Sequence, residues 1–237
     1  MKKLLILFVL PMILLCYSSC KKINGKGDIV TEIRGFTGFT AIQISLEADL
    51  HFTPDTIYSV KISAQQNILD IIETTMEGGT LIFKVKEHYV IGRHDPITIY
   101  ITAPNVNLLD ISGSGNIYQS GTWNGDNLRT NISGSGSIVL DLLETPELSV
   151  SISGSGSSVG LGGAASKETL NISGSGNIDL VEVAADTVYA AISGSGDIKV
   201  SVGKYLEATI SGSGNVLYQG NPVIVTHITG SGTVRPL

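Results

Sequence analysis

The sequence predicts an all-β fold: a single-chain β-solenoid, or β-helix, with coils of 18 to 21 residues and a β-rich N-terminal cap region. The main observation is a pentapeptide, Ile-Ser/Thr-Gly-Ser-Gly, that occurs seven times in the second half of the chain. The copies begin at Ile111, Ile132, Ile152, Ile172, Ile192, Ile210 and Ile228, with spacings of 21, 20, 20, 20, 18 and 18 residues. Such a period indicates one structural unit stacked along an axis.

The second observation is that apolar and polar residues alternate on both sides of each glycine pair. Leu170 and Ile172 precede one pair, and Ile178 and Leu180 continue the alternation after it. Two short strands therefore flank a corner, and each coil buries its apolar side chains against its neighbours. A corner that stacks on its own copies leaves little room for Cβ atoms and often needs a positive φ, which explains two glycines per coil. Polar residues interrupt the apolar series at Gln119 and Ser158.

The N-terminus has the pattern of a secretion signal. Lys2 and Lys3 precede an apolar run over residues 4–15, and small residues lead to Cys20. This arrangement resembles a bacterial lipoprotein signal, which implies that residues 1–19 are removed and that Cys20 carries the lipid. Residues 20–27 then form an anchor linker. The alternatives are an ordinary signal peptide with an incidental cysteine, or a short membrane anchor.

Residues 28–105 predict a β-rich cap. Six apolar residues alternate without a break from Ile42 to Phe52, which is typical of a half-buried strand. Residues 67–77 fit either a short helix or an irregular strand, and Gly78-Gly79 ends this segment as a turn. Because no linker separates the cap from the repeat solenoid at residues 106–237, we favour one continuous domain over residues 28–237. At the other end, Pro236 is expected to blunt the last strand edge, since it lacks an N–H donor.

The composition narrows the classes of function. A net charge of −6 and the lack of a basic patch beyond Lys21, Lys22 and Lys26 argue against a nucleic-acid partner. Those three lysines lie beside the predicted anchor, where they can meet lipid headgroups or solvent. Cys16 lies in the predicted signal, so Cys20 would be the sole cysteine of the mature chain and no intrachain disulfide is expected.

Four motifs, taken in their order along the chain, resemble those of a known protein family. They are Phe36-Thr37-Gly38-Phe39, Tyr58-Ser59-Val60-Lys61-Ile62, Gly78-Gly79-Thr80-Leu81, and Ile99-Tyr100-Ile101-Thr102-Ala103-Pro104 followed by the serial Ser-Gly-Ser-Gly copies. This order resembles the auto-transporter adhesin head GIN domain family of Bacteroidota envelope proteins, over residues 28–237. The resemblance implies a secreted, solenoid-like domain with an adhesive role. It implies no catalytic residues, because the family has none defined.

The sequence does not support a phosphate-binding loop, a calcium-binding repeat, a metal site or a catalytic site. The Gly-Ser-Gly copies lack the Lys-Ser/Thr ending of a phosphate loop, and their period is twice that of calcium-binding nonapeptides. Four aspartates occupy different places in their coils: Asp110, Asp126, Asp141 and Asp179. One segment contains His88, Arg93, His94 and Asp95. We interpret it as a polar loop in preference to a metal site or an acid–base site. We therefore predict no enzyme, no metal and no cofactor.

A row of hydroxyl residues is the candidate binding feature. It comprises Ser112, Ser133, Ser153, Ser173, Ser193, Ser211 and Thr229, which should stack into an outward ladder that a glycan or another repeating ligand could contact. The alternative is that small polar residues merely fit a tight corner. Trp123, in the longest repeat, is either an exposed loop contact for a ligand or a partly buried anchor of that loop.

These observations predict a lipid-anchored outer-membrane protein, surface-exposed or periplasm-facing, that acts as a non-catalytic, adhesin-like binding module. The predicted partners are the membrane, through the N-terminal lipid, and a glycan or surface protein, with exposed strand edges able to pair two chains. The alternative is a periplasmic structural or regulatory lipoprotein, and a carbohydrate-active β-helix enzyme is a distant third. Asp-Thr-apolar tripeptides at Thr56 and Thr187 resemble the O-glycosylation motif of Bacteroidota.

Overall fold

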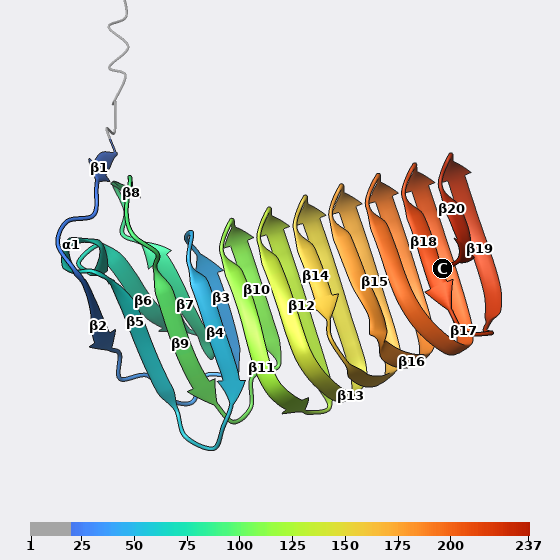
Figure 1. Cartoon of the computed structure of the whole chain (residues 1–237), viewed down its shortest axis with the longest axis horizontal. Coiled ribbons are helices and arrows are strands. Elements are labelled where there is room, and N and C mark those ends of the chain that lie inside the picture. Colours follow the sequence, from blue (N-terminus) through green and yellow to red (C-terminus); the bar gives the residue numbers. More distant parts are fainter. Residues whose placement is uncertain (1–19) are drawn as a thin grey trace, which may run out of the picture.

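The computed structural model describes residues 20–237, and the predicted signal peptide at residues 1–19 lies outside the described residues. Strands make up 71% of these described residues, and about six stacked coils form an elongated β-solenoid (Figure 1). The predicted fold class is therefore confirmed. Within the described part, the one helix is α1 (Gln66–Leu69), which is followed by strand β6 (Ile72–Glu77), so the ambiguous segment 67–77 contains both structures. No helix among these residues is long and apolar enough to span a membrane.

Each coil has two flat faces that meet at the glycine corner. Face A consists of β10 (Leu108–Gly113), β12 (Asn127–Gly134), β15 (Gly163–Gly174), β19 (Val223–Gly230) and the second halves of β13 (Ser137–Gly154), β16 (Asn177–Gly194) and β17 (Asp197–Gly212). Face B consists of β11 (Asn116–Asn124), β14 (Ser157–Gly160), β18 (Asn215–Gln219), β20 (Thr233–Pro236) and the first halves of β13, β16 and β17. All these pairings are parallel. The three long strands run round the bend opposite the corner and join the two faces.

The cap continues both faces towards the N-terminus. Its strands are β2 (Ile29–Ile33), β3 (Ala41–Ser45), β4 (Asp49–Pro54), β5 (Ser59–Gln65), β6, β7 (Thr80–Val85) and β9 (Thr98–Ala103). Strand β3 pairs in parallel with β10, and β4 pairs in parallel with β11, so the cap and the repeats share one sheet. Antiparallel strands then end the stack, because β6 pairs with β7 on one face and β5 pairs with β9 and β2 on the other.

The segment that we expected to act as an anchor linker contains a short strand. Strand β1 (Lys21–Ile23) pairs in parallel with β8 (Tyr89–Ile91), in a two-stranded sheet beside the cap. The pairing is reinforced by backbone hydrogen bonds from Lys21 N to His88 O and from Gly92 N to Ile23 O, both 2.7 Å long. The chain immediately after Cys20 is therefore docked on the domain.

The corner shows why each repeat needs two glycines. Gly154 has a φ of +127°, and a Cβ atom there would overlap the carbonyl oxygen of Gly134 in the preceding coil. A Cβ atom on Gly156 would meet the Ile132 side chain and the Gly136 carbonyl oxygen. The close approach allows Ser155 N to donate a 2.9 Å hydrogen bond to Gly134 O, so successive corners stack directly.

The core lies between the two faces and is mainly aliphatic. On face A, Ile132, Ile152, Ile172, Ile192 and Ile210 form one buried column, and the phase of the alternation is maintained on face B. Gln119 and Ser158 do not shift this phase: both side chains point inward and are buried. Gln119 is satisfied there, because its Nε2 donates to Gly121 O and its Oε1 accepts from Asp141 N.

One coil, residues 157–174, carries two of the five polar residues buried in the repeat core; the other three are Gln119, Thr130 and Thr145. Ser158 and Glu168 are fully buried in it, and neither side chain has a hydrogen-bond partner. Glu168 lies in register between Leu148 and Val188, so it occupies a position where its neighbouring coils place aliphatic residues. Burial raises the pKa of the Glu168 carboxyl from 4.5 to about 8.

The two ends of the solenoid differ. At the C-terminal end, β19 exposes Val223 and Ile228, whereas the equivalent isoleucine of the preceding coil, Ile210, is 1% exposed. Pro236 lies in β20 opposite Tyr218, within the last paired segment. Whether these edges pair two chains stays a prediction.

Candidate functional site

The seven residues of the predicted hydroxyl ladder lie in register on face A. Ser112 pairs with Ser133, Ser133 with Ser153, and the series continues through Ser173, Ser193 and Ser211 to Thr229. All seven residues are exposed. Neighbouring strands in a sheet are about 4.8 Å apart, so the row extends for about 29 Å. The chain thus presents one hydroxyl per coil along a straight line.

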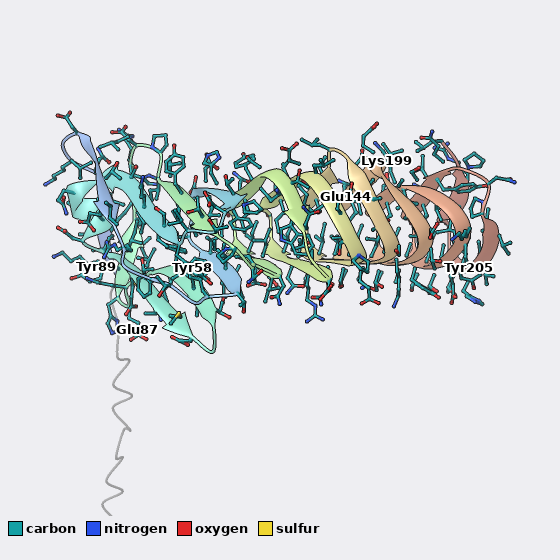
Figure 2. All side chains as sticks on the ribbon, turned by 90° about the horizontal axis from the view of Figure 1, so that it is seen from below. Tyr58, Glu87, Tyr89, Glu144, Lys199 and Tyr205 are labelled. Atoms are coloured by element: carbon teal, nitrogen blue, oxygen red, sulfur yellow. The ribbon has the colours of Figure 1, made fainter. Side chains whose placement is uncertain are left out.

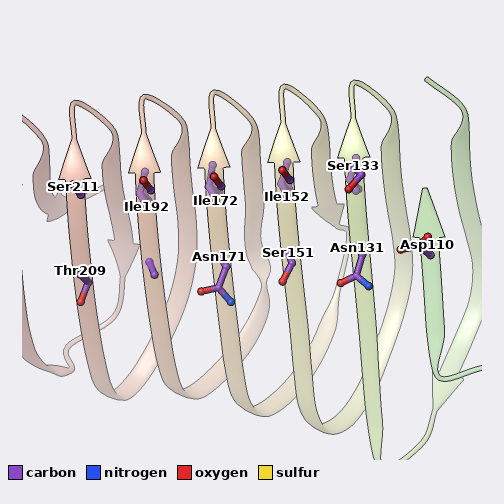
Figure 3. Close-up of a pocket in the computed structure, with 15 residues that line it drawn as sticks. Asp110, Asn131, Ser133, Ser151, Ile152, Asn171, Ile172, Ile192, Thr209 and Ser211 are labelled. Carbon is purple, nitrogen blue, oxygen red and sulfur yellow. The ribbon is translucent and has the colours of Figure 1, made fainter. Parts of the chain in front are cut away.

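A second outward row runs beside the ladder, two residues earlier in each strand. It contains Asp110, Asn131, Ser151, Asn171, Ala191 and Thr209 (Figure 3). The two rows line a shallow groove of about 620 Å³ over five adjacent strands and the end of β10. The sequence-based prediction did not include this second row, because its side chains differ from coil to coil and only the register brings them together.

The groove carries little charge, and its lining combines hydroxyl and amide groups with a larger apolar surface. Asp110 is its one carboxylate; burial raises the pKa of this group, and the hydrogen bond with Asn131 opposes that shift. The other polar side chains are hydroxyls and amides, which can both donate and accept hydrogen bonds, and the rest of the lining is isoleucine and alanine. Such a surface is suited to an extended neutral ligand with many hydroxyl or amide groups, and it lacks the fixed charges that a strongly charged polymer would need.

Face B carries a different ladder, close to the corner. It is formed by the residue after the second glycine of each repeat: Asn116, Ser137, Ser157, Asn177, Asp197, Asn215 and Thr233. These side chains bond to one another between coils, for example Asn215 Nδ2 to Asp197 Oδ1 at 2.9 Å and Thr233 Oγ1 to Asn215 Oδ1 at 2.7 Å. Because their polar groups are occupied, this row stabilises the stack. The recurrence of Asn, Asp and Ser at one position was the signal for it in the sequence.

Three aromatic rings also stack across face B. His51 lies between Tyr100 and Tyr118, with ring centroids 5.3 and 5.2 Å apart and ring planes inclined by 17° and 19°. The rings cover one another's faces, so they present edges and hydroxyl tips to solvent. This arrangement differs from a platform on which a sugar ring lies flat.

Trp123 is not an exposed ligand contact. Its side chain is 5% exposed, and its Nε1 donates a 2.8 Å hydrogen bond to the backbone oxygen of Val106. The indole thus anchors the loop of the longest repeat over the core, which corrects the loop-contact interpretation and agrees with the structural alternative. The cause is a register shift between Gln119 and Thr122, which turns Trp123 inward opposite Leu143.

The structure does not assemble the candidate catalytic residues. Asp141 accepts a hydrogen bond from Gly121 N, and Asp179 pairs with Lys199 at 3.0 Å on face B. Within residues 20–237, no group of three or more His, Cys, Asp and Glu side chains is placed to hold a metal ion. Cys20 is exposed at the start of the described chain.

Comparisons with known proteins agree with this architecture. A family model described as "Putative auto-transporter adhesin, head GIN domain" matches residues 38–222. No protein in the curated sequence comparison matches the chain.

Several solved structures share the fold. A putative adhesin from Bacteroides fragilis is 24% identical, with a TM-score of 0.85 over 91% of this chain and 100% of that chain. A putative lipid binding protein from Parabacteroides distasonis is 25% identical, with a TM-score of 0.78 over 92% and 100% of the two chains. A putative adhesin from Parabacteroides merdae is 22% identical, with a TM-score of 0.74 over 92% and 99%. Since the family model covers most of the solenoid and cap, the chain belongs to the auto-transporter adhesin head GIN domain family.

Proposed function

We propose that this protein is a lipid-anchored, non-catalytic binding module of the cell envelope, which uses face A to hold an extended glycan or a surface protein. The observation that carries this proposal is the pair of in-register rows that lines the groove on face A. The seven ladder residues are exposed, and no hydrogen bond between their side chains is formed, in contrast to the corner row on face B. Their donors and acceptors are therefore available to a ligand.

The rigidity of the surface also supports binding. Backbone ladders and stacked corners hold each hydroxyl at a fixed spacing, so a ligand meets pre-arranged groups and little side-chain freedom is lost on binding. Serine has a short side chain, which further limits that entropy cost. Single hydroxyl contacts are weak, and affinity would come from repetition along the groove.

The binding test compares two triple variants on an array of immobilised neutral and acidic glycans. Replacement of Ser153, Ser173 and Ser193 by alanine should weaken binding to a neutral glycan by about tenfold or more, since three hydrogen bonds of about 0.5–1.5 kcal/mol each are lost. The matched control replaces Ser120, Thr122 and Ser166, which are exposed near the bend. Equal effects of both variants, or no binding by the unmodified protein, would contradict the assignment to face A.

The anchor and its location need separate tests. Intact mass of the purified protein should show a chain that begins at a lipid-modified Cys20, and an unmodified cysteine would refute the anchor. Protease treatment of intact and lysed cells then decides the side of the membrane. Cleavage in intact cells supports adhesion, whereas protection until lysis supports the periplasmic structural or regulatory alternative.

A further inference from the structure

A polar pocket lies between the docked N-terminal segment and the loop after β8. Its volume is about 670 Å³, and it is lined by Lys22, Asn24, Gly25, Gln65, Arg93, His94 and Asp95. It forms at the N-terminal end of the solenoid, the end at which Glu87 and Tyr89 lie (Figure 2). Of the ionisable side chains in this lining, two are basic (Lys22 and Arg93), one is a histidine and one is a carboxylate.

The pocket is built from ordered contacts. Asn24 Oδ1 accepts a 3.0 Å hydrogen bond from Arg93 N, and Asn24 O accepts a 2.8 Å bond from Asn67 Nδ2. Gln65, which is 7% exposed, accepts from Asp95 N and donates to Gly27 O. These bonds tie the segment after Cys20 to the cap.

Two glycines allow this close seating. A Cβ atom on Gly92 would overlap Asn24 Oδ1, and a Cβ atom on Gly25 would overlap Gln65 Oε1. The backbone of residues 22–25 therefore lies directly against the cap and holds the Lys22 side chain at the mouth of the pocket.

The cations at the pocket have no carboxylate partner in the described structure. Neither Lys22 nor Arg93 forms an ion pair among residues 20–237, whereas Lys199 and Lys204 pair with Asp179 and Asp186. His94 Nδ1 lies 2.6 Å from the backbone oxygen of Asp95, so Nδ1 donates to that oxygen, and Nε2 donates to an anion only when the ring is the imidazolium. Together these groups offer several donors to one anion.

The pocket has more basic than acidic side chains, whereas the chain as a whole is acidic. Residues 20–237 contain 13 Lys and Arg residues and 21 Asp and Glu residues, a net charge of −8. The two unpaired basic side chains at this end of an acidic chain can therefore attract a ligand of opposite charge. Arg supplies a planar fork of N–H donors and Lys a mobile point charge, a combination that fits phosphate oxygens.

We propose that this pocket binds a phosphate group through Lys22, Arg93 and His94. Lys22 follows Cys20 by two residues, a reach of at most about 7 Å, so a lipid on Cys20 would bring phospholipid headgroups to the pocket. In that case headgroup binding also fixes the orientation of the solenoid relative to the membrane. Only this choice of headgroup over free phosphate rests on the proposed anchor.

The test uses residues 20–237 with Cys20→Ser. This part contains every described element, and the neighbouring structures align over their whole length with 91–92% of the chain, so the domain folds without the preceding residues. Inorganic phosphate is titrated while amide NMR shifts of residues 22–25 and 92–95 are followed. Sedimentation then measures binding to phosphatidylcholine vesicles with and without phosphatidylglycerol. The variant is Lys22→Gln with Arg93→Gln, and the charge-matched control is Lys199→Gln with Lys204→Gln.

Saturable phosphate shifts in the unmodified protein and the control, lost in the pocket variant, support the site. If vesicle binding also falls about 30-fold in the pocket variant alone, as expected for two basic residues near an anionic surface, the phosphate belongs to a headgroup. Phosphate shifts without vesicle binding support the same pocket with free phosphate as its ligand. Absence of phosphate shifts, or an equal loss in both double variants, overturns the proposal. If the intact mass of the native protein shows no lipid on Cys20 while the domain still binds phosphate, the anchor is refuted and the pocket stands.

Discussion

Replacement of Glu168 by leucine should stabilise the solenoid, and the gain should grow as the pH rises from about 5 to about 8. The carboxyl is fully buried between Leu148 and Val188 and has no hydrogen-bond partner. Leucine restores the aliphatic column at this position and removes the ionisable group. The chain then no longer has to keep a proton on a buried carboxyl when it folds.

The magnitude follows from the pKa difference between the two states. The ordinary pKa of a glutamate carboxyl is 4.5, and burial raises the pKa of Glu168 to about 8, so the folded state binds more protons throughout this interval. The free energy of unfolding therefore falls as the pH rises from about 4.5 towards about 8. At pH 7 the cost reaches about 3 kcal/mol, since each pKa unit corresponds to about 1.4 kcal/mol.

Urea denaturation at several pH values between 5 and 8 tests this reasoning, with far-UV circular dichroism as the signal. The unmodified protein should lose stability across the range, and Glu168→Leu should be less sensitive to pH. Glu168→Gln should lose the same pH dependence but gain less stability, because it leaves an amide buried. Glu182→Leu, at an exposed site on the bend, is the matched control. A Glu168→Leu variant with the pH dependence of the parent protein, or with lower stability at pH 8, would refute the account.

Four further variants test other parts of the structure. Trp123→Ala should lower the free energy of unfolding by about 3–5 kcal/mol. Because Trp123 is the single tryptophan, the fluorescence emission of the parent protein should be blue-shifted and resistant to iodide quenching, and ready quenching would contradict its burial. Gly154→Ala should lower the free energy of unfolding in urea by about 3 kcal/mol, because Gly154 has a positive φ and the new Cβ would overlap Gly134. Gly38 also has a positive φ but has open space around it, so Gly38→Ala should lower the free energy of unfolding by about 1 kcal/mol. Equal losses would be inconsistent with corner stacking. Asp197→Ala should cost about 1–2 kcal/mol, because Asn215 N and Nδ2 lose their acceptor, and an unchanged midpoint would show that the corner row on face B adds no stability. Ser153→Ala should change the free energy of unfolding by less than about 0.5 kcal/mol, so a larger loss would indicate that the ladder serves the fold.

The repeat region was predictable because one short motif recurs at nearly constant spacing, so every copy carries the same structural information. The spacing of the pentapeptides gives the coil length, and the alternation around Ile172 and Ile178 gives the inward phase. The ladder register follows from these two facts, since equivalent positions of stacked coils must lie side by side. Gln119 and Ser158 seemed to interrupt the pattern only because alternation was judged by polarity and not by direction.

The cap and the pocket were less predictable for physical reasons. Alternation in β5 and β7 is the same for parallel and antiparallel partners, so the change of pairing that ends the stack leaves no mark in the sequence. Strand β1 has three residues, which are too few for a periodic signal, and its partner β8 is 68 positions away. The pocket depends on that long-range contact. Trp123 turned inward through a register shift that composition does not encode.

The unlike ends of the solenoid give its assembly a direction. The cap has antiparallel strands and buries the bulky side chains of Phe39, Phe52 and Phe83, so it can form a stable nucleus from its own residues. Each later coil pairs with the coil before it, and the N-terminal part of a chain emerges first during synthesis. We expect the solenoid to grow coil by coil from the cap, with the exposed last turn as a growing front that orders last and frays first.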